Sequence, residues 1–237
     1  AAVVINATGA WADELRSGIG QRPRLRKLRG SHILFPASRF PLRRAVSFLH
    51  PADRRPVFAL PWEGVTLFGT TDVDHGETVE TDPVISAGEF EYLMDGLAYA
   101  FPSLALTAAD AQAVFAGVRP VVSTGQSEPS KVSRDHVLWR EMGLLTVTGG
   151  KLTTFRLMAH DALEAVRRRL PGRPAFDPRQ RVLDLPPAEA NSADFEPAVR
   201  LRLLGRYGAD APQLIAASPD ELSPIGDSLS LWAELRW

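Results

Sequence analysis

A double glycine between a strand pattern and a helical pattern constrains the fold of this chain more than any other feature. Residues 143–148 alternate as a strand does, Gly149 and Gly150 follow, and an apolar helical face begins near Thr153. Two successive glycines permit a tight turn and a close approach of the backbone to another group. The sequence therefore predicts a strand, a glycine turn and a helix N-terminus in direct succession.

The predicted helix N-terminus suits an anionic group or the electron-rich edge of a ring. The first turn of a helix exposes backbone amides and carries about half a positive charge from the helix dipole. Lys151 adds a full charge at the same place, and Thr153 or Thr154 can cap the helix. An ordinary turn whose lysine faces solvent explains the same pattern equally well.

The composition excludes several classes of protein. The 237 residues include no cysteine, which excludes disulfides, iron–sulfur clusters and zinc sites built from thiolates. No apolar run reaches the roughly 18 residues that a membrane-spanning helix needs, and no signal peptide is recognisable. The chain opens on an apolar strand pattern without an initiator methionine, so we expect a fragment cut within a domain.

Positive charge is concentrated near the beginning of the chain. Residues 1–60 carry 11 Lys and Arg against 3 Asp and Glu, although the net charge of the whole chain is −1. Aromatic residues are not interleaved with these arginines as a base-stacking surface requires, so we expect no nucleic-acid partner. The segment Arg22–Arg55 instead suggests a contact with an anionic membrane surface or an acidic ligand. A solvated face is the alternative.

The remaining patterns predict an antiparallel middle part enclosed by two pieces of another sheet. Residues 2–7 are apolar enough for burial on both faces of a parallel sheet. A chain that leaves this sheet and returns to it places the middle part over the strand ends, where ligands bind in open α/β sheets. Further strands are expected over residues 28–36, 56–62 and 65–72 (the last two joined by a tight hairpin at Glu63 and Gly64), 114–122 (interrupted at Arg119 and Pro120), and 132–139 and 143–148, which form an antiparallel pair. Helices are expected over residues 87–101, ended by Pro102, and 153–170, and a helix pair over 194–217.

Residues 70–76 are polar and rich in turn-forming residues. Asp72, Asp74 and His75 are potential metal ligands in this segment, but a solvated loop is the simpler interpretation. We therefore expect no metal site.

Six short motifs occur within the first 154 residues, namely Asn6–Asp13, Gly30–His32, Gly69–Val73, Gly117–Pro120, Pro129–Asp135 and Gly149–Thr154. In order and approximate spacing they resemble the motifs of the aerobic type of FAD-dependent glycerol-3-phosphate dehydrogenase. Each motif alone is weak evidence, whereas six in register are specific. The resemblance covers residues 1 to about 170 strongly and the helical remainder only weakly.

The resemblance implies an α+β fold of the D-amino-acid-oxidase type, with an α/β remnant beside an antiparallel sheet. Residues 1–20 and 143–172 would belong to the FAD-binding domain and residues 21–142 to an antiparallel substrate domain. Residues 173–237 would form a linker and a truncated helical C-terminal domain. The glycine-rich dinucleotide fingerprint G-x-G-x-x-G of such proteins is absent from this chain.

The resemblance also implies an activity. Members of this family oxidise sn-glycerol 3-phosphate to dihydroxyacetone phosphate and pass the electrons through FAD to a quinone. They associate peripherally with the inner, cytoplasmic face of the membrane, and homo-oligomerisation is left open. The alternatives are an amine or amino-acid oxidase of the same fold, and a non-catalytic binding or scaffold fragment.

A buried phosphodianion requires fixed cations, and arginine provides permanently charged, bidentate recognition. By resemblance, we expect Arg119, Arg134 and Lys151 to converge on the substrate, with Asp135 orienting Arg134. Surface ion pairs are the alternative for the two arginines.

Hydride transfer requires a group that accepts the proton of the substrate hydroxyl. Arginine is too weak a base, so we favour His32, titrating near neutrality, as the catalytic base beside Arg119 and Lys151. The resemblance leaves an arginine or a lysine open for this role, and a structural histidine is the alternative. Lys151 would stabilise negative charge on the reduced flavin or the developing alkoxide.

The residues expected to contact FAD come from two backbone segments. The segment after the double glycine would face the N1/O2 edge of the flavin, and the segment after the first strand would lie near the dinucleotide phosphate or adenosine. These residues are Gly150, Lys151, Leu152 and Thr153, and Thr8 and Gly9.

Overall fold

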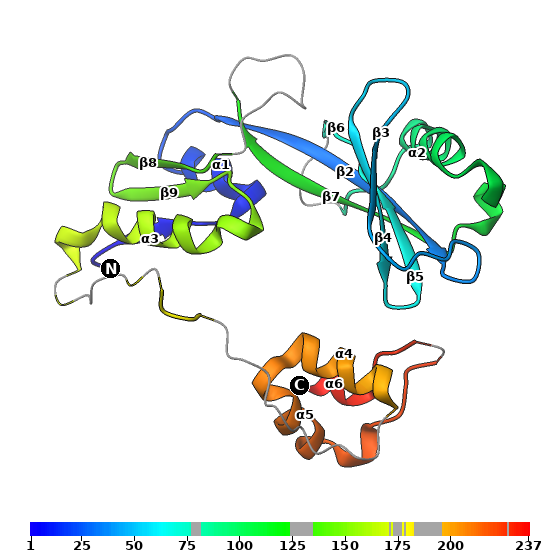
Figure 1. Cartoon of the computed structure of the whole chain (residues 1–237). Coiled ribbons are helices and arrows are strands. Elements are labelled where there is room, and N and C mark those ends of the chain that lie inside the picture. Colours follow the sequence, from blue (N-terminus) through cyan, green and yellow to red (C-terminus); the bar gives the residue numbers. More distant parts are fainter. Residues whose placement is uncertain are drawn as a thin grey trace. The chain divides into compact units, whose positions relative to one another are not determined.

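The computed structural model describes residues 1–76, 82–123, 135–170, 172, 177, 179–182, 196–226 and 228–237. It divides the chain into two compact units, Ala1–Pro174 and Ala175–Trp237. The first unit holds a three-stranded and a six-stranded sheet, and the described part of the second unit is helical (Figure 1).

The smaller sheet joins the beginning of the chain to a segment far along it. Strand β1 (Val4–Asn6) runs parallel to β9 (Leu144–Thr148), and β9 pairs antiparallel with β8 (Val137–Glu141). The buried Asn6 Nδ2 donates to the Ala12 carbonyl at 2.9 Å and to Thr146 Oγ1 at 3.3 Å. The Asn6 side-chain amide therefore ties β1 both to β9 and to the start of the helix that follows it. The predicted return of the chain to the first sheet is confirmed.

One expectation about this sheet is wrong, and another is confirmed. Val4 and Ile5 are 50% and 39% exposed, so β1 is not buried on both faces; among the described strands it pairs with β9 alone. The expected antiparallel pairing of residues 132–139 with residues 143–148 is confirmed by β8 and β9. Periodicity reports which residues are apolar but not which strand lies beside them.

The larger sheet is antiparallel and is organised around the long strand β2 (Leu25–Pro36). Its path runs β3-β4-β5-β2-β6, and β7 (Ala113–Val122) lies along β2, as Figure 1 shows. The predicted hairpin at Glu63 and Gly64 is confirmed. The remaining strands are β3 (Val46–Leu49), β4 (Pro56–Trp62), β5 (Val65–Gly69) and β6 (Val73–Asp74).

Strand β7 continues through Arg119 and Pro120, where we expected an interruption. Pro120 lies opposite Lys27 of β2, and no other described strand pairs with β7. A proline lacks the amide hydrogen that a second neighbouring strand would need, so an edge strand tolerates it.

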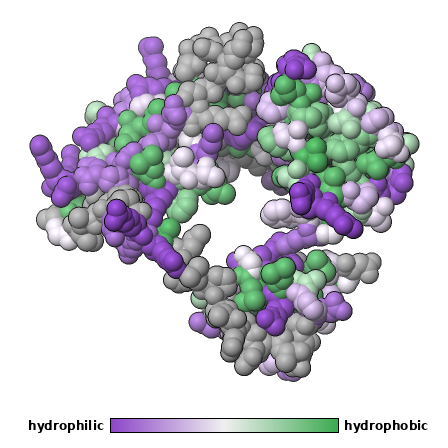
Figure 2. All heavy atoms as spheres, viewed as in Figure 1, coloured by the Kyte–Doolittle hydropathy of each residue, from purple (hydrophilic) through white to green (hydrophobic). Residues whose placement is uncertain are grey.

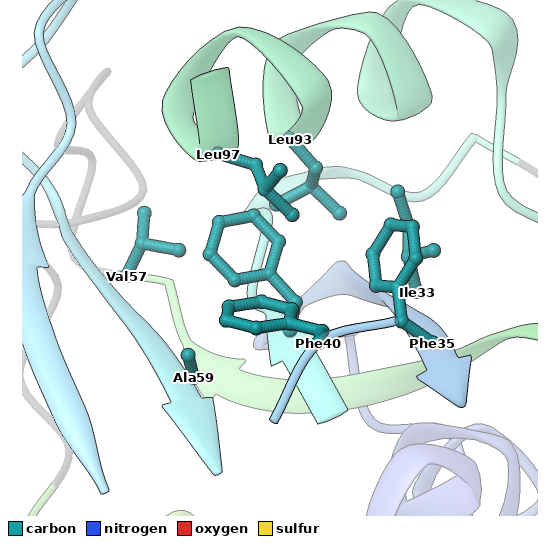
Figure 3. Packing of buried hydrophobic residues seen from close by; sticks show 8 residues of the cluster. Ile33, Phe35, Phe40, Val57, Ala59, Leu93 and Leu97 are labelled. Carbon is teal, nitrogen blue, oxygen red and sulfur yellow. The ribbon is translucent and has the colours of Figure 1, made fainter. Parts of the chain in front are cut away.

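One face of the larger sheet is covered by helix α2 (Ala87–Ala100), close to the predicted bounds. Ser86 and Glu89 form a reciprocal capping box at its N-terminus. Figure 3 shows Leu93 and Leu97 of α2 packed against the buried aromatic core. Because alternate strand residues point to opposite faces, Ile33 and Phe35 lie under α2, whereas Gly30 and His32 lie on the opposite face.

The remaining helices in the described part of the first unit are short. They are η1 (Gly9–Trp11), α1 (Ala12–Ser17), η2 (Pro102–Leu104), η3 (Ala108–Asp110), η5 (Leu152–Thr154), α3 (Phe155–Ala165) and η6 (Arg167–Arg169).

The second unit has a small core of its own, centred on Leu203, Ala211 and Leu231. The ion pair between Arg202 and Glu234, 2.7 Å apart, ties its first helix to its last. The expected helix pair is present as α4 (Pro197–Tyr207) and α5 (Ala211–Ala217), with η7 (Gly208–Asp210), η8 (Pro219–Glu221) and α6 (Trp232–Arg236) completing the unit.

Most of the basic side chains between Arg22 and Arg55 form ion pairs with carboxylates of the first unit. Their carboxylate partners come from several different elements, so these charges hold the unit together. The paired residues are Arg24, Arg26, Lys27, Arg29, Arg39 and Arg55. Figure 2 accordingly shows hydrophilic and hydrophobic residues intermixed over the face in view. The expected contact with an anionic membrane surface stays a prediction.

Candidate functional site

The ring of His32 lies on the face of the larger sheet that α2 does not cover. His32 is opposite Gly69 of β5 and Phe115 of β7. A side chain at position 69 would collide with the imidazole, and Phe115 stacks on it with 4.8 Å between ring centroids. Gly69 and Phe115 together therefore fix the position of the His32 ring.

The environment of His32 favours its neutral form. Burial, and then the charge of Arg119, lower the pKa of His32 to about 4. The expectation that His32 titrates near neutrality is wrong, because both influences oppose protonation. Its Nδ1 atom is buried and has no hydrogen-bond partner among the residues that the structure describes.

The guanidinium of Arg119 lies over the backbone of Gly30. A Cβ atom at position 30 would stand 2.5 Å from Arg119 Nη2, so only glycine leaves room for this placement. Arg119 Nη2 donates to the Thr71 carbonyl at 2.8 Å and to Asp72 Oδ1 at 2.9 Å. The sequence predicted a role for Arg119, which lies within β7, and these two acceptors hold its guanidinium beside Gly30.

Two glycine-bearing turns lie at the same edge of the smaller sheet. Gly149 and Gly150, with φ of +75° and +71°, follow the carboxyl end of β9. Gly9, with φ of +61°, follows the carboxyl end of the parallel strand β1. A side chain is strained at such φ values, so backbone rather than side chains is presented at this edge.

The residues after the double glycine are accessible. Lys151, Leu152 and Thr153 are exposed, Leu152 by 89%. The expected cap by Thr153 or Thr154 is wrong, since no threonine side chain caps α3. Thr154 Oγ1 instead accepts from the Lys151 amide at 3.0 Å and donates to the Lys151 carbonyl at 2.9 Å, which closes one tight turn before α3 begins.

Candidate residues from the larger sheet and from the glycine turn line one cavity of about 280 Å³. Leu28, Asp72, Arg119, Pro120 and Val121 line it from the larger sheet, and Gly149, Gly150, Lys151 and Leu152 line it from the glycine turn. Two of the three predicted cations thus lie beside the predicted turn. His32, Thr8, Gly9 and Thr153 do not line this cavity, and Arg134 lies outside the described residues.

Sequence reasoning misjudged the segment from Asp72 to His75. Asp72 and His75 are 4% and 8% exposed, so the expected solvated loop is wrong for both residues. Within the described part of the chain, no three or more His, Cys, Asp or Glu side chains are placed to hold a metal ion. Asp72 lies instead between Arg119 and Arg55, at 2.9 and 3.1 Å.

Glu89 is the other functional residue that sequence reasoning missed. Its carboxylate is buried and accepts from Arg29 Nη2 at 2.6 Å, Thr71 Oγ1 at 2.7 Å and Ser31 Oγ at 2.8 Å. Burial opposes its ionisation, but the hydrogen bonds from Thr71, Arg29, Ser86 and Ser31 outweigh burial and lower the pKa of Glu89 to about 2. The capping-box spacing from Ser86 to Glu89 was the available signal.

Comparison with known proteins places this geometry among flavoproteins. Residues 1–156 match the family model described as DAO, FAD dependent oxidoreductase. The aerobic glycerol-3-phosphate dehydrogenase of Staphylococcus aureus is 39% identical over 170 residues, which are 70% of this chain and 30% of that protein. The resemblance drawn from the six motifs is therefore confirmed, and the chain spans less than a third of that relative's length.

Solved structures agree with this match. The X-ray structure of the Bacillus halodurans glycerol-3-phosphate dehydrogenase complexed with FAD is 35% identical, with a TM-score of 0.61 over 70% of this chain and 32% of that chain. The FAD-bound L-α-glycerophosphate oxidase of Mycoplasma pneumoniae, 22% identical with a TM-score of 0.50 over 70% of this chain and 42% of its own, shares the fold. The expected mixed α/β fold with an antiparallel sheet is confirmed.

Proposed function

The chain belongs to the DAO family of FAD-dependent oxidoreductases, and we propose that it supplies the substrate cavity for oxidation of sn-glycerol 3-phosphate to dihydroxyacetone phosphate. The observation that carries this proposal is the common cavity of Arg119 and Lys151 beside the glycine turn. The 39% identity to a glycerol-3-phosphate dehydrogenase supports the choice of substrate. We propose that residues 1–20 and 143–172 belong to the FAD-binding domain and residues 21–142 to the substrate domain, with β8 at the boundary paired to β9 of the smaller sheet.

Two cations in one cavity suit a phosphodianion better than a carboxylate. Arg119 offers a planar, permanently charged group, and Lys151, which lines the same cavity, offers an ammonium. Each hydrogen bond between charged partners contributes about 1.5–3 kcal/mol. An amino-acid oxidase needs one arginine for its substrate carboxylate, so the second cation favours the phosphorylated substrate. Arg134 is proposed as a third cation.

The glycine-bearing edge of the smaller sheet fits FAD. Gly9, Gly149 and Gly150 present backbone at positive φ beyond the carboxyl ends of two parallel strands, where a flavin or phosphate can approach closely. We propose that Thr8, Gly9, Gly150, Lys151, Leu152 and Thr153 hold the cofactor. When bound, FAD supplies the hydride acceptor for this reaction.

The chain's own residues would manage the charge that develops on the substrate. His32, on the same sheet face as Arg119 but outside the lining of the substrate cavity, is neutral at physiological pH and is proposed to accept the hydroxyl proton, although its low pKa makes it a weak base. The ammonium of Lys151 would stabilise the developing alkoxide. Arg119 would orient the substrate through its phosphate.

The acid limb of the pH profile tests the role of His32. Protonation removes the proton acceptor, so kcat/KM of the full-length enzyme should fall with an apparent pKa of about 4, the value for His32. Arg119→Met removes one of the two causes of the low His32 pKa. The apparent pKa of the acid limb should therefore rise in this variant. An acid limb of the wild type with an apparent pKa near the ordinary histidine value of about 6.5, and with the same apparent pKa in Arg119→Met, would contradict this assignment.

A quinone acceptor and a peripheral membrane position are proposed together with the substrate. Within the described residues, no helix is both long enough and apolar enough to cross a membrane. Within the segment Arg22–Arg55, the exposed arginines outside the ion pairs given above are Arg22, Arg43, Arg44 and Arg54, and we propose that these meet the anionic headgroups. Flotation of the full-length protein with anionic liposomes should weaken with salt, and flotation that is insensitive to salt would count against this contact.

Anaerobic reduction of bound flavin tests the proposed reaction. The purified full-length protein should be yellow, and sn-glycerol 3-phosphate should bleach its flavin absorbance. Glycerol tests the need for the phosphate, and glycine tests the oxidase alternative. Bleaching by glycine but not by glycerol 3-phosphate would refute the substrate assignment, and a colourless protein would favour a non-catalytic binding or scaffold role.

A further inference from the structure

A buried carboxylate lies between two arginines at the wall of the candidate substrate cavity. The Asp72 side chain is 1% exposed, and its Oδ1 atom accepts from Arg119 Nη2 at 2.9 Å. Its Oδ2 atom lies 3.1 Å from Arg55 Nη2, and Arg55 Nη1 donates to the Asp72 carbonyl at 3.2 Å. Asp72 and Arg119 line the same cavity, whereas Arg55 lines a separate hollow with Tyr92.

The peptide that carries Asp72 is itself anchored to two other elements. Thr71 Oγ1 donates to Glu89 Oε1 of α2 at 2.7 Å and accepts from the Ser31 amide of β2 at 2.9 Å. The Thr71 carbonyl accepts from Arg119 Nη2 at 2.8 Å. Arg119 Nη2 is therefore held by two consecutive residues of a segment that α2 and β2 fix in place.

A long side chain such as that of Arg119 loses rotamer entropy when it is fixed. The Arg119 side chain is 36% exposed, so packing alone does not fix it. Asp72 supplies a fixed acceptor before any ligand is present, and pre-organisation of this kind improves ligand binding because less entropy is lost on binding.

We infer that Asp72 is a positioning residue, which holds the Arg119 guanidinium ready for the substrate phosphate while Arg55 holds Asp72 from the side away from the cavity. This inference rests on the proposed function. A buried carboxylate is costly unless it is paired. Asp72 is paired with both Arg119 and Arg55. Asp72 does not touch the reacting atoms; it acts through Arg119.

A double-mutant cycle in the full-length holoenzyme separates positioning from a general structural role. Asp72→Asn keeps the size of the side chain but removes its charge, and it should raise KM for glycerol 3-phosphate about tenfold. In the Arg119→Met background the same substitution should change KM by less than about twofold, because the group that Asp72 positions is absent. Asp74→Asn, which changes an exposed carboxylate two residues further along that pairs with Arg26, is the matched control and should leave KM unchanged.

Equal increases in KM in both backgrounds would overturn the inference, as would an unchanged KM in Asp72→Asn. Should Asp72→Asn not fold, Arg55→Met takes its place in the cycle and should show the same dependence on Arg119. Wild-type enzyme that does not oxidise glycerol 3-phosphate refutes the proposed function instead. Turnover by the wild type with no effect of either substitution refutes only the positioning role.

Discussion

Arg119→Met in the full-length enzyme is expected to lower kcat/KM for sn-glycerol 3-phosphate at least about 100-fold. The substitution removes a guanidinium that lines the cavity and can make two charged hydrogen bonds to a phosphate, each contributing about 1.5–3 kcal/mol. Methionine retains an unbranched apolar side chain, so the packing over Gly30 is largely kept. Steady-state kinetics with a dye acceptor measures the effect.

The matched control for this prediction is Arg39→Met. Arg39 is half exposed and pairs with Asp110 outside the cavity, so its loss should leave kcat/KM within about twofold of the wild type. The flavin content of both variants should equal that of the wild type. A similar small change in Arg119→Met and Arg39→Met would remove Arg119 from the substrate site.

Glu89→Ala is expected to destabilise the protein by about 3–5 kcal/mol, the usual cost of removing one partner from a buried ion pair. The substitution leaves Arg29, with a side chain only 15% exposed, without its carboxylate, and it removes the acceptor of Ser31 and Thr71. Urea unfolding of the full-length protein measures the loss. Glu91→Ala, an exposed substitution in the same helix, should cost less than about 0.5 kcal/mol.

The stabilising effect of Glu89 should depend on pH. The folded state lowers the pKa of Glu89 from 4.5 to about 2, so its carboxylate stabilises the fold fully above pH 4.5. As pH falls from 4.5 toward 2, the wild type should lose this contribution and approach the stability of Glu89→Ala. Equal stability of Glu89→Ala and Glu91→Ala at neutral pH would contradict the assigned network.

Sequence patterns predicted the turns and helices that are determined by neighbouring residues in the chain. The double glycine at Gly149 and Gly150 predicted a tight turn, and both residues adopt positive φ. The apolar spacing from Ala87 to Phe101 and the terminating Pro102 predicted α2 almost to the residue. The turn at Glu63 and Gly64 likewise predicted the hairpin that joins β4 to β5.

Properties that depend on distant partners were not predictable from these patterns. The burial of Asp72 is made acceptable by Arg55 and Arg119, which lie far from it in sequence. The low pKa of His32 depends on burial and on Arg119 of another strand. Thr154 bonds to the Lys151 peptide instead of capping α3, because several local hydrogen bonds compete at a helix start.

The most direct test is a crystal structure of the full-length protein with FAD and sn-glycerol 3-phosphate. We predict a phosphate oxygen about 2.7–2.9 Å from the Arg119 guanidinium, in the cavity that Lys151 also lines. A phosphate bound elsewhere, with Arg119 still paired only to Asp72 and the Thr71 carbonyl, would contradict the central claim.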